Sequence, residues 1–295
     1  MNIAPSRSYG ARIADWSINT VMLLIIAATV LPMAHIAAVS LSDGRAVLRD
    51  EVSLWPVGFT FDAFRVALSD SLIVRSLGNS VFYTVFGTAI NLLMTSLCAY
   101  PLARRSFSGR TVGTWIVTIT LFFSGGLIPL YLLVLNLGMM NTVWAIVLPS
   151  AITPWYVFLM RTYFMGIPND IYDAAAVDGA NEMRIFWQIA MPLAKPILAT
   201  LLLFYAVGRW NEFFDPLIYL NDQNKFPLQL VLRNLLLEGT YDQSGQQLGA
   251  GSDFAVVAKT LKYAAIMIST LPILMVYPFV QRYFVKGVMI GSLKG

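Results

Sequence analysis

Long apolar stretches constrain this chain more than any other feature of its sequence. A helix that crosses a bilayer needs about 20 mostly apolar residues. Six segments reach that length, and they cover roughly residues 18–39, 77–103, 112–136, 142–165, 196–220 and 261–285. Only 12% of the residues are charged, which is about half the usual share in a soluble protein. The sequence therefore predicts an all-α, polytopic membrane protein, with one transmembrane domain over residues 1–295 embedded in the lipid bilayer.

The first apolar segment follows Arg7 and Arg12, as the core of a signal peptide would. Its apolar run is longer than the ~7–15 residues of such a core. We therefore expect a retained membrane anchor, although the small residues Ala37 and Ala38 leave cleavage open as an alternative.

The placement of lysine and arginine orients the spans. If the N-terminus is cytoplasmic, the inner segments hold eleven Lys and Arg against five Asp and Glu. The outer segments then hold eight against nine. Positive residues collect on the cytoplasmic side, so we expect both termini in the cytoplasm.

This topology creates long outer loops at about 40–76 and 222–259 and a cytoplasmic loop at about 166–194. The apolar run 228–237 in the second outer loop is too short to span the bilayer. We expect it to lie along the membrane surface. The outer loops fit a partner that docks from outside, or alternatively serve as solvated linkers.

The cytoplasmic loop predicts two short helices. Asn169 or Asp170 can cap a first helix that runs to Val177. Gly179 can adopt the left-handed conformation that ends this helix. A second helix should run from about Asn181 until Pro192 stops it.

Small side chains distinguish the first of these helices from a core helix, which would carry Leu and Phe. Asp173, Ala176 and Ala180 fall on one face at helical spacing, with Val177 beside them. Such a face lets another surface approach closely, and it predicts a docking element.

The stretch from Asp173 to Ala180, with Phe186, Ile189, Pro192 and Pro196 after it, resembles the EAA loop of the membrane subunits of binding-protein-dependent ABC importers. In that family the loop forms coupling helices that sit in a cleft of the ATPase subunit. The family's usual Glu is Asp173 here, which keeps the charge and shortens its reach. The resemblance implies a type I permease fold, with coupling to the ATPase through Asp173, Ala174, Ala175, Asp178, Gly179, Ala180 and Pro192.

Resemblance extends over nearly the whole chain. Asn79-Ser80, the run 210–217 and the tail 281–295 are similar to the carbohydrate-importer permeases, the group that includes the smaller membrane subunit of maltose importers. Residues 122–129 resemble a branch that handles oligosaccharides, including the second permease subunits of alginate-oligosaccharide importers.

The family implies specific partners and a specific role. The partners are a homologous second permease, two ATPase subunits that bind ATP and Mg²⁺, an extracytoplasmic solute-binding protein and a saccharide. The chain would lie in the bacterial cytoplasmic (inner) membrane. It would form half of the translocation path for an oligosaccharide.

Ionisable residues inside a span are expensive, and they are candidates for function. The fifth apolar segment concentrates polar and aromatic side chains that suit contact with a sugar: Arg209, Trp210, Asn211, Glu212 and Asp215. Arg209 and Glu212 are three residues apart and can neutralise one another. For an acidic sugar, Arg209 would be the first candidate to contact its carboxylate. The alternatives are an ion pair that fixes helix packing, or side chains that reach the outer interface.

The sequence lacks the motifs that several functional classes require. No phosphate-binding P-loop, nucleophile elbow or HExxH motif occurs. One cysteine, Cys98, and one histidine, His35, exclude an internal disulfide and a Cys or His metal site. The net charge of +4 follows the topology and does not indicate nucleic-acid binding.

We therefore expect a permease subunit that is not an enzyme and has no cofactor of its own. An ion-coupled secondary transporter that uses Arg209, Glu212 and Asp215 is the alternative. No constellation of residues argues for a membrane-bound enzyme or a scaffold.

Overall fold

The computed structural model describes residues 9–237 and 260–276. The regular elements in these ranges are helices, which confirms the predicted all-α class. Two compact units divide the chain. One includes the residues up to Asp70 and the later described residues to Ile268, and the other runs from Ser71 to Leu237 and resumes at Ser269.

The first unit is built on α1 (Tyr9–Ser40), which contains the first predicted span. From Ile13 to Leu31 most of its large apolar side chains are exposed, as expected of a lipid-facing helix. Two short helices follow it, α2 (Gly44–Leu48) and α3 (Asp62–Ser69). A small apolar core forms where α1 ends, from Ala38, Val39, Ala46, Val47 and Val52.

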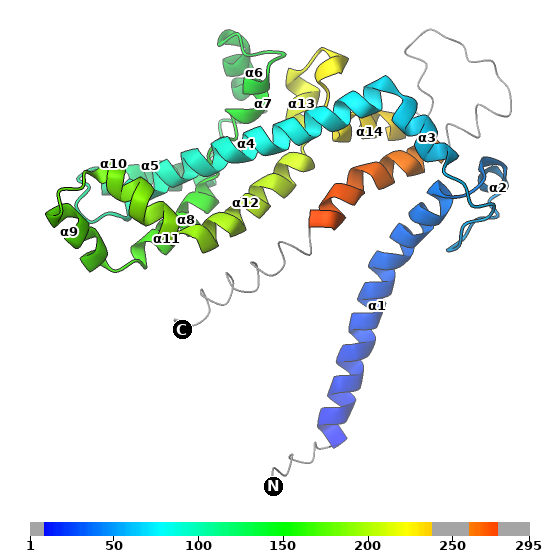
Figure 1. Cartoon of the computed structure of the whole chain (residues 1–295), viewed down its shortest axis with the longest axis horizontal. Coiled ribbons are helices and arrows are strands. Elements are labelled where there is room, and N and C mark those ends of the chain that lie inside the picture. The colour runs from blue at the N-terminus through cyan, green and yellow to red at the C-terminus, as the bar shows by residue number, and fades with distance from the viewer. Residues whose placement is uncertain (1–8, 238–259, 277–295) are drawn as a thin grey trace. The chain divides into compact units, whose positions relative to one another are not determined.

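The second unit is organised along α4 (Ser71–Ala103), the longest helix, which contains the second predicted span. Figure 1 shows α12 (Lys195–Trp210) running along α4, with α8 (Pro154–Met165) also packed against it. Their shared core includes residues with almost no exposed surface, namely Ala99, Met160, Phe164 and Leu201.

Three predicted spans are broken helices. The third comprises α5 (Arg110–Phe122) and α6 (Leu127–Asn136), which meet at 117° across a turn where Gly126 has a φ of +84°. The fourth comprises α7 (Val143–Val147) and α8, separated by a linker in which Thr153 is extended before Pro154.

The fifth span ends as a helix at Trp210 and resumes as α13 (Phe214–Tyr219). The sixth is described as a helix over Thr260–Val276, and its predicted continuation to residue 285 lies outside the described residues.

Within the described residues, two unbroken helices are long and apolar enough to cross a membrane, Ile13–Ser40 and Ser71–Ala103. Counting each bent pair as one span, 110–136 and 182–210 raise this number to four. The interruptions lie beside glycine and proline, which free backbone groups that neighbouring segments must satisfy in lipid.

The second outer loop contains the expected helix, α14 (Leu228–Leu237), after a short 3-10 turn, η2 (Gln223–Lys225). Its Leu228, Leu230 and Val231 side chains are buried by protein, and the Leu228 N–H donates to Ser80 Oγ at 2.8 Å. The apolar face of α14 therefore packs on α4 in place of the predicted membrane surface. Residues 238–259 of this loop lie outside the described residues.

Candidate functional site

The predicted cytoplasmic loop folds as a helical hairpin at one end of α4, here called the 169–193 hairpin (Figure 1). Its first arm is α9 (Asn169–Val177). The second arm contains α10 (Glu182–Ile185), a π-helical turn η1 (Phe186–Ala190) and α11 (Met191–Leu193).

Gly179 ends α9 as the sequence predicts. Its φ is +80°, which glycine adopts without a steric penalty. The N–H of Gly179 donates to the Ala176 carbonyl and that of Ala180 to the Ala175 carbonyl, both at 3.0 Å. This is the Schellman arrangement, which satisfies the last carbonyls of a helix.

The caps differ in part from the prediction. Asn181 caps α10, where its Oδ1 accepts from the Arg184 N–H at 2.8 Å. The cap of α9 is Pro168, without a side-chain hydrogen bond, so Asn169 and Asp170 already belong to the helix. Because Pro168 has φ −55° and ψ 133°, the chain enters the helix one residue earlier than an Asn or Asp cap would allow.

Pro192 does not stop the second arm, contrary to the prediction. The helix reaches it through the π turn, in which the Met191 N–H donates to the Phe186 carbonyl, and it continues to Leu193. A proline lacks its own N–H, and it is tolerated in the first turn of a new helical segment. The chain then bends by 80° into α12, which begins at Lys195.

The outer face of the hairpin consists of small, acidic and apolar side chains. Val177 is 88% exposed. The predicted coupling residues on this face are Asp173, Ala174, Asp178, Gly179 and Pro192, whereas Ala175 is buried and Ala180 is half-buried against the core. Ala175 lies three residues after the buried Tyr172 and therefore shares its inward face. Docking of an ATPase on the outer face stays a prediction.

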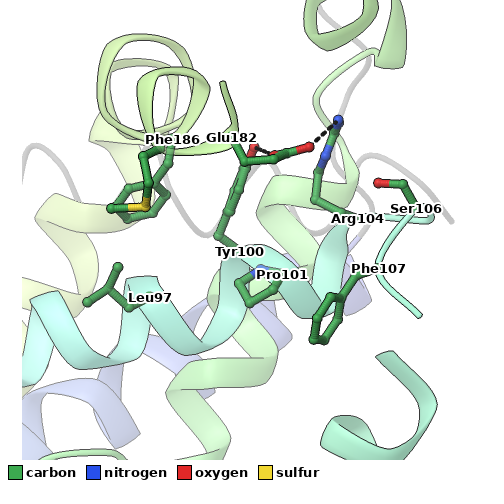
Figure 2. Close-up of a pocket in the computed structure, with 9 residues that line it drawn as sticks. Leu97, Tyr100, Pro101, Arg104, Ser106, Phe107, Glu182 and Phe186 are labelled. Atoms are coloured by element: carbon green, nitrogen blue, oxygen red, sulfur yellow. Dashed lines mark hydrogen bonds and ion pairs between the residues drawn. The ribbon is translucent and has the colours of Figure 1, made fainter. Parts of the chain in front are cut away.

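Four side chains fix the hairpin to the end of α4, and Figure 2 shows three of them, Tyr100, Arg104 and Glu182. Glu182 Oε2 accepts from the Tyr100 hydroxyl at 2.9 Å, and its Oε1 lies 3.6 Å from Arg104 Nη2. The Arg104 guanidinium also stacks on the Tyr172 ring, 4.2 Å from its centroid. Both arms are thereby tied to the end of α4. The four-residue spacing of Tyr100 and Arg104 at the end of a span is the signal that could have indicated this cluster.

A cavity of about 370 Å³ lies beside this cluster, between the end of α4 and the second arm. Apolar side chains, including Leu97, Pro101 and Phe186, form most of its wall. Burial raises the pKa of the Tyr172 phenol, and the neighbouring Arg104 opposes part of that rise. The Tyr172 hydroxyl therefore remains a proton donor at neutral pH.

Arg209 is buried, and the chain itself satisfies its charge. Its Nε donates to Asn91 Oδ1 at 3.0 Å, and its Nη atoms donate to the carbonyls of Ile146, Val147 and Ser150 at 2.9, 3.2 and 3.4 Å. These carbonyls lie at the end of α7 and just after it, where a helix leaves its last carbonyls without intrahelical donors. Within the described residues the expected ion pair with Glu212 is not formed, because the guanidinium turns toward α7. The structure favours the packing alternative for Arg209.

The other predicted path residues surround the gap between α12 and α13. Trp210 is buried, and its Nε1 donates to the Ser269 carbonyl at 2.9 Å. Asn211 is exposed, and Glu212 and Asp215 are half-buried. Two of the five predicted residues therefore support packing, and three border an interruption in the helix. Among the described residues, no group of three or more His, Cys, Asp or Glu side chains could hold a metal ion.

These features define a class: a helical protein with apolar helices long enough to span a bilayer and an exposed hairpin of small residues. Residues 10–290 match the family described as the inner membrane component of binding-protein-dependent transport systems, and the chain belongs to that family. Its location is therefore the inner membrane. The family match confirms the resemblance that the residues between Asp173 and Pro196 carry.

Two relatives come from Bacillus subtilis strain 168. Protein LplC is 42% identical over 270 residues, which cover 91% of this chain and 90% of LplC. The polygalacturonan/rhamnogalacturonan transport system permease protein YtcP is 39% identical over 284 residues, which cover 96% and 99% of the two chains.

A solved structure shows the same fold. One chain in the crystal structure of a bacterial ABC transporter involved in the import of the acidic polysaccharide alginate matches with a TM-score of 0.86. The two are 33% identical, and the match covers 95% of this chain and 100% of the other. The predicted ABC importer permease fold and the resemblance to carbohydrate-importer permeases are confirmed.

Proposed function

We propose that this chain forms half of the translocation path of an ATP-driven importer for an acidic oligosaccharide. A homologous permease supplies the other half, two ATPase subunits bind ATP and Mg²⁺, and a solute-binding protein delivers the saccharide. Both termini and the 169–193 hairpin lie in the cytoplasm.

The observation that carries this proposal is the outer face of the hairpin. Val177 is 88% exposed and lies among exposed alanines, so this face is apolar, as surfaces that contact another protein often are. Small neighbours let a second protein approach the backbone closely. A cytoplasmic ATPase fits this position, because the chain holds no phosphate-binding loop of its own.

The anchoring of the hairpin supports a mechanical role. Movement of a docked subunit would pass to α4 through the Tyr100–Glu182 hydrogen bond and the Arg104–Glu182 ion pair. It would pass to α12 through the 80° bend after Leu193. The break between α12 and α13 lets the two ends of the fifth span move separately, which suits a path that opens alternately to the two sides.

The substrate class is supported by two similar proteins. YtcP is named for polygalacturonan and rhamnogalacturonan transport, and the alginate transporter imports an acidic polysaccharide. Both substrates carry carboxylates. We assign the exposed and half-exposed side chains at the α12–α13 break, namely Asn211, Glu212, Phe213, Phe214 and Asp215, to the wall of the path.

The test reconstitutes the complete transporter with its solute-binding protein and measures ATP hydrolysis. Oligosaccharides of uronic acids should stimulate hydrolysis, whereas neutral oligosaccharides of equal length should not. Equal stimulation by both would contradict the acidic substrate class. Uptake driven by a proton or sodium gradient in vesicles without ATP would contradict the ATP-driven class itself.

A further inference from the structure

A second, smaller cavity lies beside Arg104, is not lined by Glu182, and is here called the arginine cavity. Its volume is about 60 Å³, and its polar lining residues are Arg104, Arg105, Arg110, Asn169, Tyr172 and Tyr100, whose hydroxyl already donates to Glu182. Water needs only about 10–15 Å³ of such space, so the arginine cavity has room for an anion of several heavy atoms.

Two buried donors at this cavity lack acceptors. Arg104 Nε and the Tyr172 hydroxyl have no hydrogen-bond partner in the described part of the chain. Tyr172 is only 2% exposed, and its phenol stays protonated at neutral pH. Buried polar atoms are almost always satisfied, and two orphaned donors that line one cavity indicate a missing acceptor.

The helix ends at the cavity also favour negative charge. Arg110 is the first residue of α5, and Asn169 is the first residue of α9. Neither preceding cap residue, Gly109 or Pro168, offers a side-chain acceptor to the first amides. Free amides and the positive end of the helix dipole make such termini suitable for anions.

The local charge balance is positive. Glu182 lies 3.6 Å from Arg104 but does not line the cavity, and Asp170 is an exposed residue in the first turn of α9. Within the described residues no ion pair involves Arg105 or Arg110, so two guanidinium groups at the cavity are not neutralised. Arginine forks match the oxygens of a phosphate group with paired hydrogen bonds.

We propose that the arginine cavity binds a phosphate group, supplied by an anionic phospholipid headgroup or by free phosphate. The lipid source is favoured because the cavity lies where the spanning helix α4 ends, at the depth of headgroups. Only the choice of the cytoplasmic leaflet rests on the proposed function. The bound phosphate would brace α4, α5 and α9 together beside the 169–193 hairpin.

The experiment uses the full-length chain, purified in detergent and analysed by native mass spectrometry. It is titrated with phosphatidylglycerol, with phosphatidylcholine and with inorganic phosphate in separate arms. The test variants are Tyr172→Phe, which keeps the ring under Arg104, and the double change Arg105→Gln with Arg110→Gln. Arg184→Gln is the matched control, because Arg184 is an exposed arginine of the same hairpin.

Phosphatidylglycerol should bind the unchanged chain at least about tenfold more tightly than phosphatidylcholine. The double variant should lose this preference, Tyr172→Phe should weaken it, and Arg184→Gln should keep it. Binding of inorganic phosphate alone, with the same dependence on Arg105 and Arg110, would assign the site to free phosphate. Equal binding of all lipids, or a preference that survives the double variant, would overturn the proposal.

Discussion

Arg209 shows how a charge is accommodated inside this fold at the scale of single residues. Four hydrogen bonds engage its guanidinium, and three of the acceptors are carbonyls at the end of α7. Its stem fits against Gly87 of α4, where a Cβ atom would lie 3.1 Å from Arg209 Nε and 3.2 Å from Cδ. Gly87 is therefore required for a close approach and not for its backbone freedom.

Gly87→Ala should displace Arg209 and lower the free energy of unfolding by about 1–3 kcal/mol, the usual range for overpacking. Gly78→Ala is the matched control on the same helix, because a Cβ there meets nothing within 4 Å. It should leave stability unchanged or raise it by up to about 1 kcal/mol through helix propensity. Thermal unfolding in detergent measures both, and equal stability of the two variants would contradict the packing role of Arg209.

At the scale of elements, the 169–193 hairpin depends on one left-handed residue. Gly179 has a φ of +80°, and a Cβ there would meet nothing within 4 Å. A substitution therefore strains the backbone without a clash. Gly138, in the turn after α6, has a φ of +66° and an equally open surrounding.

Gly179→Ala should weaken the Schellman turn by about 1–2 kcal/mol and speed hydrogen exchange of the Ala180 amide. It should also reduce ATP hydrolysis stimulated by the solute-binding protein. Gly138→Ala carries the same strain in another turn and should leave the stimulated rate unchanged. If both variants lower that rate equally, the hairpin has no special part in coupling.

The hairpin also shows what sequence can and cannot predict. Gly179 and the cap Asn181 were predictable because their backbone roles need particular residue types. The continuation of the second arm past Pro192 was not predictable, because it depends on a π-helical turn that has no clear sequence pattern. The prediction of an ion pair between Arg209 and Glu212 was wrong for a related reason. Spacing of three residues permits that contact, but the carbonyls of α7 come from a segment more than 60 residues away.

For the described chain as a whole, apolar length predicted where the spans lie, whereas their continuity depends on local sequence, with glycine or proline at two of the three breaks. The third, fourth and fifth predicted spans are each interrupted, at Gly126, before Pro154 and after Trp210. Hydropathy averages over such breaks, so it located the segments without showing that several consist of two helices. The uneven distribution of lysine and arginine between the two sides predicts which side of the membrane is cytoplasmic, and the fold alone does not.

Labelling of single cysteines tests that orientation. In a Cys98→Ala background, Val177→Cys and Trp55→Cys place a thiol at positions that are 88% and 82% exposed. A membrane-impermeant maleimide should label position 55 in intact cells and position 177 only after the cells are opened. The reverse pattern would invert the proposed topology and remove the hairpin from the cytoplasm.

Docking of an ATPase on the 169–193 hairpin is tested by the amount of ATPase subunit that co-purifies with the inserted chain when Val177 is changed to Asp. Val177 is 88% exposed, so the change should not affect folding, and Leu137→Asp, at a 61% exposed position in the turn after α6, is the control. Val177→Asp should lose the ATPase, whereas Leu137→Asp should retain it. Undiminished ATPase association and stimulated hydrolysis in Val177→Asp would show that the hairpin is not the docking site.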